Sequence, residues 1–266
     1  MIKGKIIPMT LTPPNPIRLL VFDIDGVLTD GEATPLDLQL LAGLARLNRL
    51  SRRSPEFPAA TLCSGRSAQY VELMLQAIDG RLPGVFENGA GLYLPETYRF
   101  LPHPSLSEGS PIPAVRRRLE ETLVGSGAAY FQPGKEYSLT LFSTNPRDTG
   151  RLYELAAAAL GDLNETVDLV YSTSCLNVLP KGIDKAKGLH FLAAVTGCDL
   201  SQVLGVGDSD VDLEFLSLVG FSAAPANANP AVKDTVQYVS PFPTAHGVRD
   251  ILRHFNIPLP HGHTEQ

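Results

Sequence analysis

The sequence predicts an α/β fold in which a parallel β-sheet forms the core and an α+β domain is inserted into it. Short, continuous apolar runs, typical of strands buried on both faces of a parallel sheet, alternate with segments of helical periodicity. Between residues 85 and 180 the expected strands alternate polar and apolar residues instead, which is typical of a half-buried sheet. We therefore expect a core domain of residues 1–84 and 181–266 and an inserted domain of residues 85–180.

The first part of the core is expected to contain two strands and two helices. Four apolar residues, Leu19 to Phe22, form the first strand. Thr34 and Pro35 predict a helix start, with Thr34 as N-cap and Pro35 at the first helical position, and leucines then recur at helical spacing as far as residue 50. The apolar run from Ala59 to Cys63 predicts the second strand. A second helix is expected between Ser67 and Gly80.

The inserted domain is expected to mix antiparallel strands with helices. Asn88 and Gly89 are a typical hairpin turn, and Asn145 with Pro146 predicts the start of a capped helix. The remaining expected elements are a helix carrying Val115, Leu119 and Leu123 and strands at Tyr137–Ser143, Leu169–Ser172 and Leu176–Leu179.

The second part of the core returns to the α/β pattern. A helix is expected from Asp184 to Thr196, ended by Gly197. Three further strands and a helix opened by Asn229 and Pro230 follow; the strands are expected at Gln202–Val206, Phe221–Ala224 and Val236–Val239.

Composition excludes several classes of protein. Hydrophobic residues make up 44% of the chain and charged residues 19%, and the net charge is −6 without any basic block, which argues against nucleic acid as the main partner. The three cysteines, Cys63, Cys175 and Cys198, are widely spaced and favour neither a disulfide framework nor a zinc knuckle. No apolar stretch reaches about 18 residues. We expect a cytoplasmic protein with no membrane or export role.

Asp23 and Asp25 follow the first strand directly, where its apolar run stops. Two carboxylates so close together repel each other and are costly to bury unless a cation lies between them. Gly26 allows a sharp turn, and the carboxyl end of a parallel strand is where open α/β sheets bind ligands. The pattern Asp-x-Asp-Gly of residues 23–26 also occurs in plain turns and in calcium loops, but residues 27–29 do not continue the ligand pattern of a calcium loop. A catalytic site is therefore our interpretation.

Three more polar segments complete a pattern, namely Ser64-Gly65-Arg66, Lys185 at a helix start, and Gly207-Asp208-Ser209 followed by Asp212. In this order, the four segments resemble the four motifs of the haloacid dehalogenase (HAD) superfamily of phosphohydrolases. The insertion between the second and third motifs resembles the C2 cap of the Cof-type subclass IIB, and residues 86–90 and 226–228 resemble further stretches of that subclass. The resemblance implies a Rossmann-like core with an α+β cap that sets substrate specificity.

The resemblance also implies a reaction, the magnesium-dependent hydrolysis of a phosphate monoester. Asp23 would be the nucleophile that forms an aspartyl-phosphate, and Asp25 would protonate the leaving alcohol and later deprotonate water. Carboxylates of Asp23 and Asp208 suit Mg²⁺, which prefers oxygen ligands. By resemblance, the backbone carbonyl of Asp25 is a further ligand and Asp212 supports the metal shell.

Four residues are expected to bind the phosphate group: Ser64, Gly65, Lys185 and Asn227. Alternatives remain for three of them. Ser64 would otherwise cap the following helix, Asn227 would otherwise cap a turn, and Lys181 and Lys187 compete with Lys185 for the role of phosphate-binding cation. Asp210 is expected to be an exposed acid at a helix start.

The expected substrate is a small phosphorylated metabolite. The chain is similar to phosphoglycolate phosphatases of the subclass, with sucrose-phosphate and other sugar-phosphate phosphatases close behind. A phosphomutase would need several cationic groups on the cap, and the adjacent Arg116, Arg117 and Arg118 point in different directions around a helix. A binding protein that has lost catalysis is the other alternative. Val27 and Val211 depart from the usual motifs, and the oligomeric state is left open.

Overall fold

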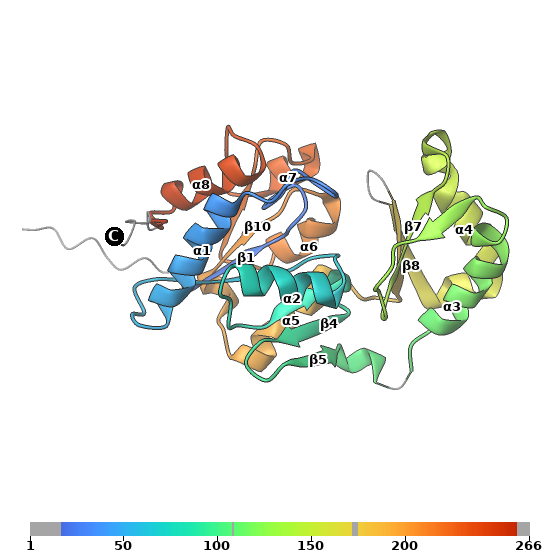
Figure 1. Cartoon of the computed structure of the whole chain (residues 1–266), viewed down its shortest axis with the longest axis horizontal. Coiled ribbons are helices and arrows are strands. Elements are labelled where there is room, and N and C mark those ends of the chain that lie inside the picture. Colours follow the sequence, from blue (N-terminus) through green and yellow to red (C-terminus); the bar gives the residue numbers. More distant parts are fainter. Residues whose placement is uncertain (1–16, 108, 172–174, 260–266) are drawn as a thin grey trace, which may run out of the picture.

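The computed structural model describes residues 17–107, 109–171 and 175–259. Figure 1 shows two lobes, a larger one that contains β1 and β10 and a smaller one that contains β7, β8, α3 and α4. The chain passes from the larger lobe to the smaller one and back, so the smaller lobe is an insertion. None of the helices in these described ranges is long and apolar enough to cross a membrane.

A five-stranded sheet forms the centre of the larger lobe, in the order β12-β11-β10-β1-β2. All four pairings are parallel, which confirms the predicted α/β class. The strands are β1 (Leu19–Phe22), β2 (Ala59–Leu62), β10 (Val203–Val206), β11 (Phe221–Ala224) and β12 (Tyr238–Val239). Because β1 lies between β2 and β10, the segment after β1 has neighbours from both ends of the chain.

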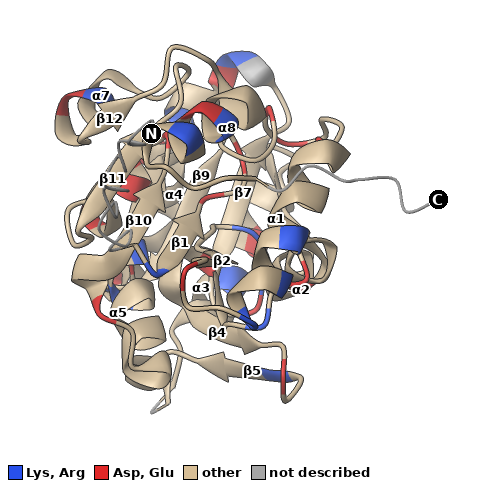
Figure 2. Ribbon diagram, turned by 90° about the vertical axis from the view of Figure 1, so that its left-hand side faces the viewer, with Lys and Arg blue, Asp and Glu red and all other residues tan. Residues whose placement is uncertain are grey.

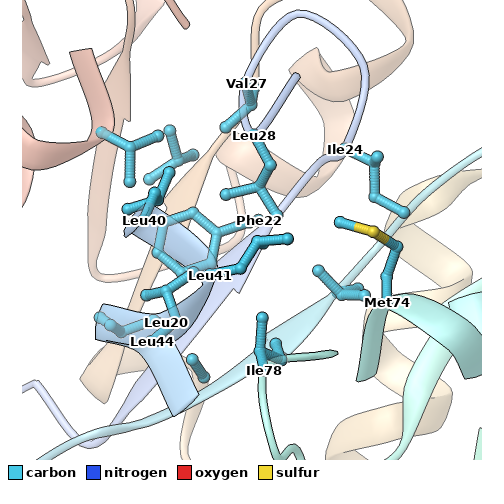
Figure 3. Close-up of a cluster of buried hydrophobic side chains, with 14 of the residues drawn as sticks. Leu20, Phe22, Ile24, Val27, Leu28, Leu40, Leu41, Leu44, Met74 and Ile78 are labelled. Atoms are coloured by element: carbon cyan, nitrogen blue, oxygen red, sulfur yellow. The ribbon is translucent and has the colours of Figure 1, made fainter. Parts of the chain in front are cut away.

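Side chains of β1 point alternately into two hydrophobic layers, as expected for a strand buried on both faces. Leu20 and Phe22 pack in one layer and Leu19 and Val21 in the other. Figure 3 shows Phe22 among residues of the first layer, which comes mainly from three helices: α1 (Leu38–Ser51), α2 (Ala68–Ala77) and α8 (Thr244–His254). The second layer is covered by α5 (Lys185–Thr196), α6 (Leu213–Leu216) and α7 (Pro230–Thr235).

The predicted start of the first helix is wrong. The helix α1 begins at Leu38, and its N-cap is Asp37, whose carboxylate accepts a hydrogen bond of 2.9 Å from the amide of Leu40. Thr34 instead donates its hydroxyl to the carbonyl of Gly31. Threonine and aspartate are both common N-caps, so the sequence offered two starts three residues apart. The terminal helix α8 was not predicted.

The Asn88–Gly89 hairpin is confirmed, in a three-stranded antiparallel sheet. Its strands are β3 (Gly84–Phe86), β4 (Gly91–Leu94) and β5 (Arg99–Pro102). A bridge from Cys63 to Val85 continues the larger sheet onto β3, and Val85 and Leu92 share the hydrophobic layer of β1. The division into domains stays a proposal, and this packing favours an insertion that starts after Pro102.

The smaller lobe is an antiparallel sheet of order β6-β7-β9-β8 covered by helices on one face. Its strands are β6 (Ala129–Phe131), β7 (Leu139–Ser143), β8 (Val167–Tyr171) and β9 (Leu176–Pro180), and its helices are α3 (Ile112–Leu119) and α4 (Leu152–Leu160). Asn145 caps the turn of 3₁₀ helix before α4, as predicted. Ser172, predicted to end a strand, lies outside the described residues.

Charged residues of both signs are distributed over both lobes, and basic and acidic segments are interspersed in Figure 2. Two ion pairs join the end of α1 to the loop after α2, because Arg49 of α1 and Arg52, the residue after α1, both bind Asp79. These pairs are partly exposed, so each adds little to stability.

We predict that Asn48→Ala lowers the free energy of unfolding by about 2–4 kcal/mol, because it leaves buried backbone groups without partners. The buried Asn48 amide donates to the carbonyls of Ala60 and Ile78 and accepts from the amide of Ala60. Urea unfolding measures the change. The exposed Gln39→Ala in the same helix is the control, and an equal effect of both substitutions would contradict the prediction.

Candidate active site

A cavity of about 290 Å³ lies at the carboxyl ends of β1, β2 and β10, and residues of both lobes line it. From the larger lobe it receives most of the residues that the sequence singled out, namely Asp23, Asp25, Ser64, Gly65, Lys185, Asp208 and Asn227. From the smaller lobe it receives Gln132, Lys135, Thr140, Cys175 and Asn177. The parallel sheet therefore brings together segments that are far apart in the sequence, as expected for this class of fold.

The ammonium group of Lys185 lies between two carboxylates. Its Nζ is 2.9 Å from Asp23 Oδ2 and 2.5 Å from Asp212 Oδ1, and all three side chains are buried. Burial lowers the pKa of Lys185, but the carboxylates of Asp212 and Asp23 raise this pKa more, so the amine stays charged. Lys185 is the first residue of α5, and Asp184 caps that helix.

Both carboxylate oxygens of Asp212 accept hydrogen bonds from other residues. Its Oδ2 accepts hydrogen bonds from the amides of Asp208 and Ser209 and from the Ser209 hydroxyl, at 2.9–3.0 Å, while its Oδ1 binds Lys185. The capping box between Ser209 and Asp212 explains the local fold of the loop after β10. Asp212 is therefore placed to hold the loop and Lys185, and its predicted support of a metal shell stays a prediction.

Asp208 differs, because its buried Oδ1 has no hydrogen-bond partner among the described residues. Burial raises the pKa of this carboxyl to about 8, and Asp23 and Asp212 add to the effect. A Cβ atom at Gly26 would lie 2.0 Å from Asp208 Oδ2, so only glycine fits there. One oxygen each of Asp23, Asp208 and Asp212 lie within 4.8 Å of one another. An unpartnered oxygen among crowded carboxylates is the environment that a divalent cation would fill.

Asp23 shares this electrostatic environment. Burial raises its pKa to about 7; Lys185 lowers it, whereas Asp212 and Asp25 raise it further. Its Oδ1 accepts a hydrogen bond of 2.7 Å from the amide of Ile24. The position is fixed by the sheet, because the amide of Asp23 binds the carbonyl of Val206 on β10.

Asp25 is held by Arg66 in a bidentate ion pair, with two N···O distances of 2.6 Å. The carboxylate of Asp25 is more exposed than that of Asp23 and is not one of the three clustered carboxylates. Arg66 follows Ser64 and Gly65 in the second motif, and its guanidinium also lies over the ring of Tyr70. The second motif thus orients Asp25 as well as lining the cavity.

The other predicted residues are placed as follows. Ser64 is buried, and its hydroxyl accepts from the amide of Arg66 rather than capping α2, whose N-cap is Ser67. The backbone of Gly65 lies against Asn88, which would leave a Cβ only 2.9 Å from Asn88 Oδ1. Neither observation assigns a ligand to these two residues, so their phosphate-binding role stays a prediction.

The Asn227 side chain has protein partners on both its polar atoms. Its Nδ2 donates to the carbonyl of Gly26, and its Oδ1 accepts from the amide of Thr244. It therefore fixes the turn that follows Asp25 against the start of α8. Asp210 is exposed, as predicted, and accepts a hydrogen bond from Asn229.

Of the three candidate lysines, Lys185 alone lines the cavity. Lys181 and Lys187 are exposed, and Lys181 pairs with Asp168.

The structure also places the two valines that depart from the usual motifs. Val27 is buried in the hydrophobic layer of Figure 3, whereas Val211 lines the cavity.

The sequence analysis gave no role to two charged residues of the site region, Glu87 and Lys135. Glu87, in the turn between β3 and β4, accepts hydrogen bonds from the amides of residues 136–138 and from the Ser138 hydroxyl, at 2.7–3.0 Å. This joins the two lobes. Lys135 is buried at the cavity wall. The turn signal of Asn88 and Gly89 masked Glu87, and a lone lysine between two strands gave no signal.

The chain is similar to known hydrolases in sequence and in fold. The sequence model of the family of haloacid dehalogenase-like hydrolases matches residues 133–252. A phosphoglycolate phosphatase of Staphylothermus marinus is 26% identical over 237 residues, covering 89% of this chain and 96% of that protein. A crystal structure from Thermoplasma acidophilum has a TM-score of 0.73 at 20% identity, covering 91% of this chain and 99% of that chain.

A haloacid dehalogenase-like hydrolase of Bacteroides thetaiotaomicron has a TM-score of 0.69 at 17% identity, and the alignment covers 90% of this chain and 99% of that one. At these identities the solved structures establish the fold. They confirm the parallel-sheet core, and the smaller lobe is consistent with an inserted cap.

We predict that the metal-free protein loses stability as the pH rises from about 4 to about 8. The folded-state pKa values of Asp23 and Asp208, about 7 and about 8, lie above the ordinary aspartate value of 3.8. In this window the folded protein holds protons that the unfolded chain has released, so stability falls with rising pH. Asp208→Asn removes one of these groups and is expected to raise the free energy of unfolding at pH 8 by at least about 1 kcal/mol.

Urea unfolding in the presence of a chelator, at pH 5 and at pH 8, measures this effect. Asp210→Asn is the matched control, because it removes an exposed acid from the same loop. An Asp208→Asn protein that is no more stable than the wild type at pH 8 would contradict the prediction.

Proposed function

We infer that this chain, which by its motifs, fold and sequence relatives is a phosphatase of the haloacid dehalogenase type, is Mg²⁺-dependent and carries the phosphoryl group transiently on Asp23. The observation that supports this most is the position of Asp23, held by Lys185 at 2.9 Å beside the unpartnered oxygen of Asp208. A small phosphorylated metabolite, phosphoglycolate or a sugar phosphate, is the proposed substrate.

Electrostatics explains why cations are needed. Like charges at about 4 Å repel by about 4 kcal/mol at an effective dielectric constant near 20, so a phosphate dianion resists a carboxylate nucleophile. The buried ammonium of Lys185 offsets part of this repulsion. Carboxylate oxygens of Asp23 and Asp208 would hold Mg²⁺, together with the backbone carbonyl of Asp25, while Asp212 would orient the loop. When bound, Mg²⁺ would neutralise charge on the transferring phosphoryl group.

The proposed reaction has two displacements. An oxygen of Asp23 attacks phosphorus, the bond from phosphorus to the substrate oxygen breaks, and Asp25 gives a proton to the departing alcohol. Asp25 then takes a proton from water, the water oxygen attacks phosphorus, and Asp23 is released as a carboxylate with free phosphate. Arg66 orients the Asp25 side chain at the cavity through its bidentate contact.

The phosphate oxygens are proposed to bind close to Ser64, Gly65 and Lys185. Ser64 supports this through its burial at the cavity wall, with its hydroxyl proton free to turn towards a ligand. Asn227 is proposed to act here through the turn at Gly26, because both its polar atoms have backbone partners.

A small substrate is favoured by the size of the cavity. At about 290 Å³, its volume lies just below the range of about 300–1,000 Å³ for ligand pockets. Phosphoglycolate, the substrate in the name of the Staphylothermus marinus relative, is smaller than sucrose phosphate. We therefore place phosphoglycolate first and sugar phosphates second.

A phosphomutase finds less support. Arg116 binds the carbonyl of Lys135, and Arg118 lies near the carbonyls of Ala159 and Leu160. Together with Arg117, these arginines lie outside the cavity lining. A binding protein without catalysis is disfavoured by the retention of Asp23 and Asp25. A cytoplasmic location, without nucleic-acid or membrane partners, is also proposed. Composition is its support.

We predict that the wild type releases phosphate from phosphoglycolate only with Mg²⁺ present, and that Asp23→Asn lowers this release more than about a thousandfold, because it removes the nucleophile. A phosphate-release assay over phosphoglycolate and several sugar phosphates measures the effect.

The control for this prediction is Asp210→Asn, which changes a carboxylate that faces solvent near the site and is expected to keep activity within about twofold. Full activity of Asp23→Asn would refute the assignment of the nucleophile. Absence of release from every ester would favour the binding protein.

A further inference from the structure

We propose that Lys135, positioned by Thr140 and Asn177, recognises a carboxylate at the far end of the phosphorylated substrate from its phosphate group. This inference rests on the proposed phosphatase function and narrows its substrate class to small phosphate monoesters that carry an acid. The three residues lie on the wall of the cavity that the smaller lobe supplies, whereas Asp23 and Lys185 lie on the wall of the larger lobe.

Lys135 is a buried cation, and the described residues include no acid paired with it. Only 6% of the residue is exposed, and in the described part of the chain no carboxylate forms an ion pair with its Nζ. Burying an unpaired charge is costly, and lysines are almost never buried without a partner. A ligand with a negative charge would supply the missing partner.

Glu87, an acid that acts electrostatically on Lys135, already has other partners. Its carboxylate accepts hydrogen bonds from the amides of Glu136, Tyr137 and Ser138. Glu87 therefore acts on Lys135 only at longer range, where it opposes the effect of burial on the pKa of the amine. Burial prevails and lowers the pKa of Lys135 to about 8.

The alternation of side chains along two strands explains why Thr140 and Asn177 face the cavity. Leu139 and Leu141 of β7 and Leu176 and Val178 of β9 pack in the core of the smaller lobe, under α3 and α4. Thr140 and Asn177 point to the opposite face and are paired across the two strands. Figure 1 shows this sheet between the two helices and the larger lobe.

A chain of hydrogen bonds fixes the direction of the lysine. The ammonium of Lys135 donates to the hydroxyl oxygen of Thr140, and this hydroxyl donates to Asn177 Oδ1 at 2.7 Å. An ammonium group has three donors, so two remain for a ligand in the cavity. The backbone is held as well, since Arg116 binds the carbonyl of Lys135 and Glu87 binds the next three amides.

Charge and size favour a carboxylate over a second phosphate. A single ammonium matches the single charge of a carboxylate, whereas a second phosphate dianion calls for several cations. The described residues that line the cavity on the smaller lobe contain one cation, Lys135. The cavity of about 290 Å³ also favours a substrate whose two anionic ends are separated by few atoms.

The test compares phosphoglycolate with ethyl phosphate, an ester of similar length without the carboxylate, in the Mg²⁺-supplied full-length enzyme. We expect the wild type to have the higher kcat/KM for phosphoglycolate. Lys135→Met should lower the ratio of the two kcat/KM values about 10- to 100-fold, mainly through KM, because a charge-assisted hydrogen bond is lost. Lys135→Arg should restore part of the ratio. Lys187→Met, which removes an exposed lysine, is the control and should leave the ratio unchanged.

The outcomes separate this inference from the function on which it rests. Equal kcat/KM values of the wild type for both esters, or an unchanged ratio in Lys135→Met, would overturn the role of Lys135 and leave the phosphatase intact. Stronger activity on a sugar bisphosphate than on phosphoglycolate would overturn the choice of a carboxylate. If the wild type releases phosphate from sugar phosphates but from neither of these two esters, the inference is overturned and the phosphatase function stands. No release from any phosphate ester would overturn the proposed function and the inference together. If Lys135→Met does not fold, Thr140→Val, which keeps the shape of the side chain, is expected to lower the same ratio to a smaller extent, and an unchanged ratio would again overturn the inference.

Discussion

The buried ammonium of Lys185 between Asp23 and Asp212 is the interaction on which the site depends. It joins the end of β1, the start of α5 and the loop after β10, segments that the sequence separates widely. Removing one member of a buried charge pair leaves an uncompensated charge, which typically costs 3–5 kcal/mol. The three residues are thus constrained together, and Asp208 is held beside them because the Asp212 carboxylate binds its amide.

The two walls of the cavity carry excess charge of opposite sign, negative on the larger lobe and positive on the smaller lobe. On the larger lobe, Asp23, Asp208 and Asp212 outnumber Lys185. Burial raises the pKa values of Asp23 and Asp208, and the neighbouring carboxylates raise them further. On the smaller lobe, no carboxylate of the described residues forms an ion pair with the buried Lys135. Both imbalances cost stability in the empty protein and are relieved by ligands of complementary charge, a divalent cation on one side and an anion on the other. This is the usual cost of a site arranged for chemistry rather than for stability.

Much of the core was predictable because its signals are local. The apolar run of β1 and the acids at its end identify both a strand and a site, and Gly197 marks the end of α5. Where two local signals compete, as Thr34 and Asp37 do for the start of α1, only packing decides. The contact of Glu87 with residues 136–138 could not be predicted, since it depends on how two lobes meet. Thr140 and Asn177 did carry a signal, because each is the polar residue of an alternating strand, but their pairing required the register of β7 and β9.

The central claim is that Asp23 carries the phosphoryl group, and trapping that intermediate tests it most directly. The enzyme would be quenched in acid during turnover of phosphoglycolate with Mg²⁺, and its peptides would be analysed by mass spectrometry. Our account predicts a phosphoryl group on the peptide that contains Asp23, on that aspartate, and none in Asp23→Asn. A phosphoryl group on another residue, or turnover by the wild type without any phosphorylated peptide, would contradict it.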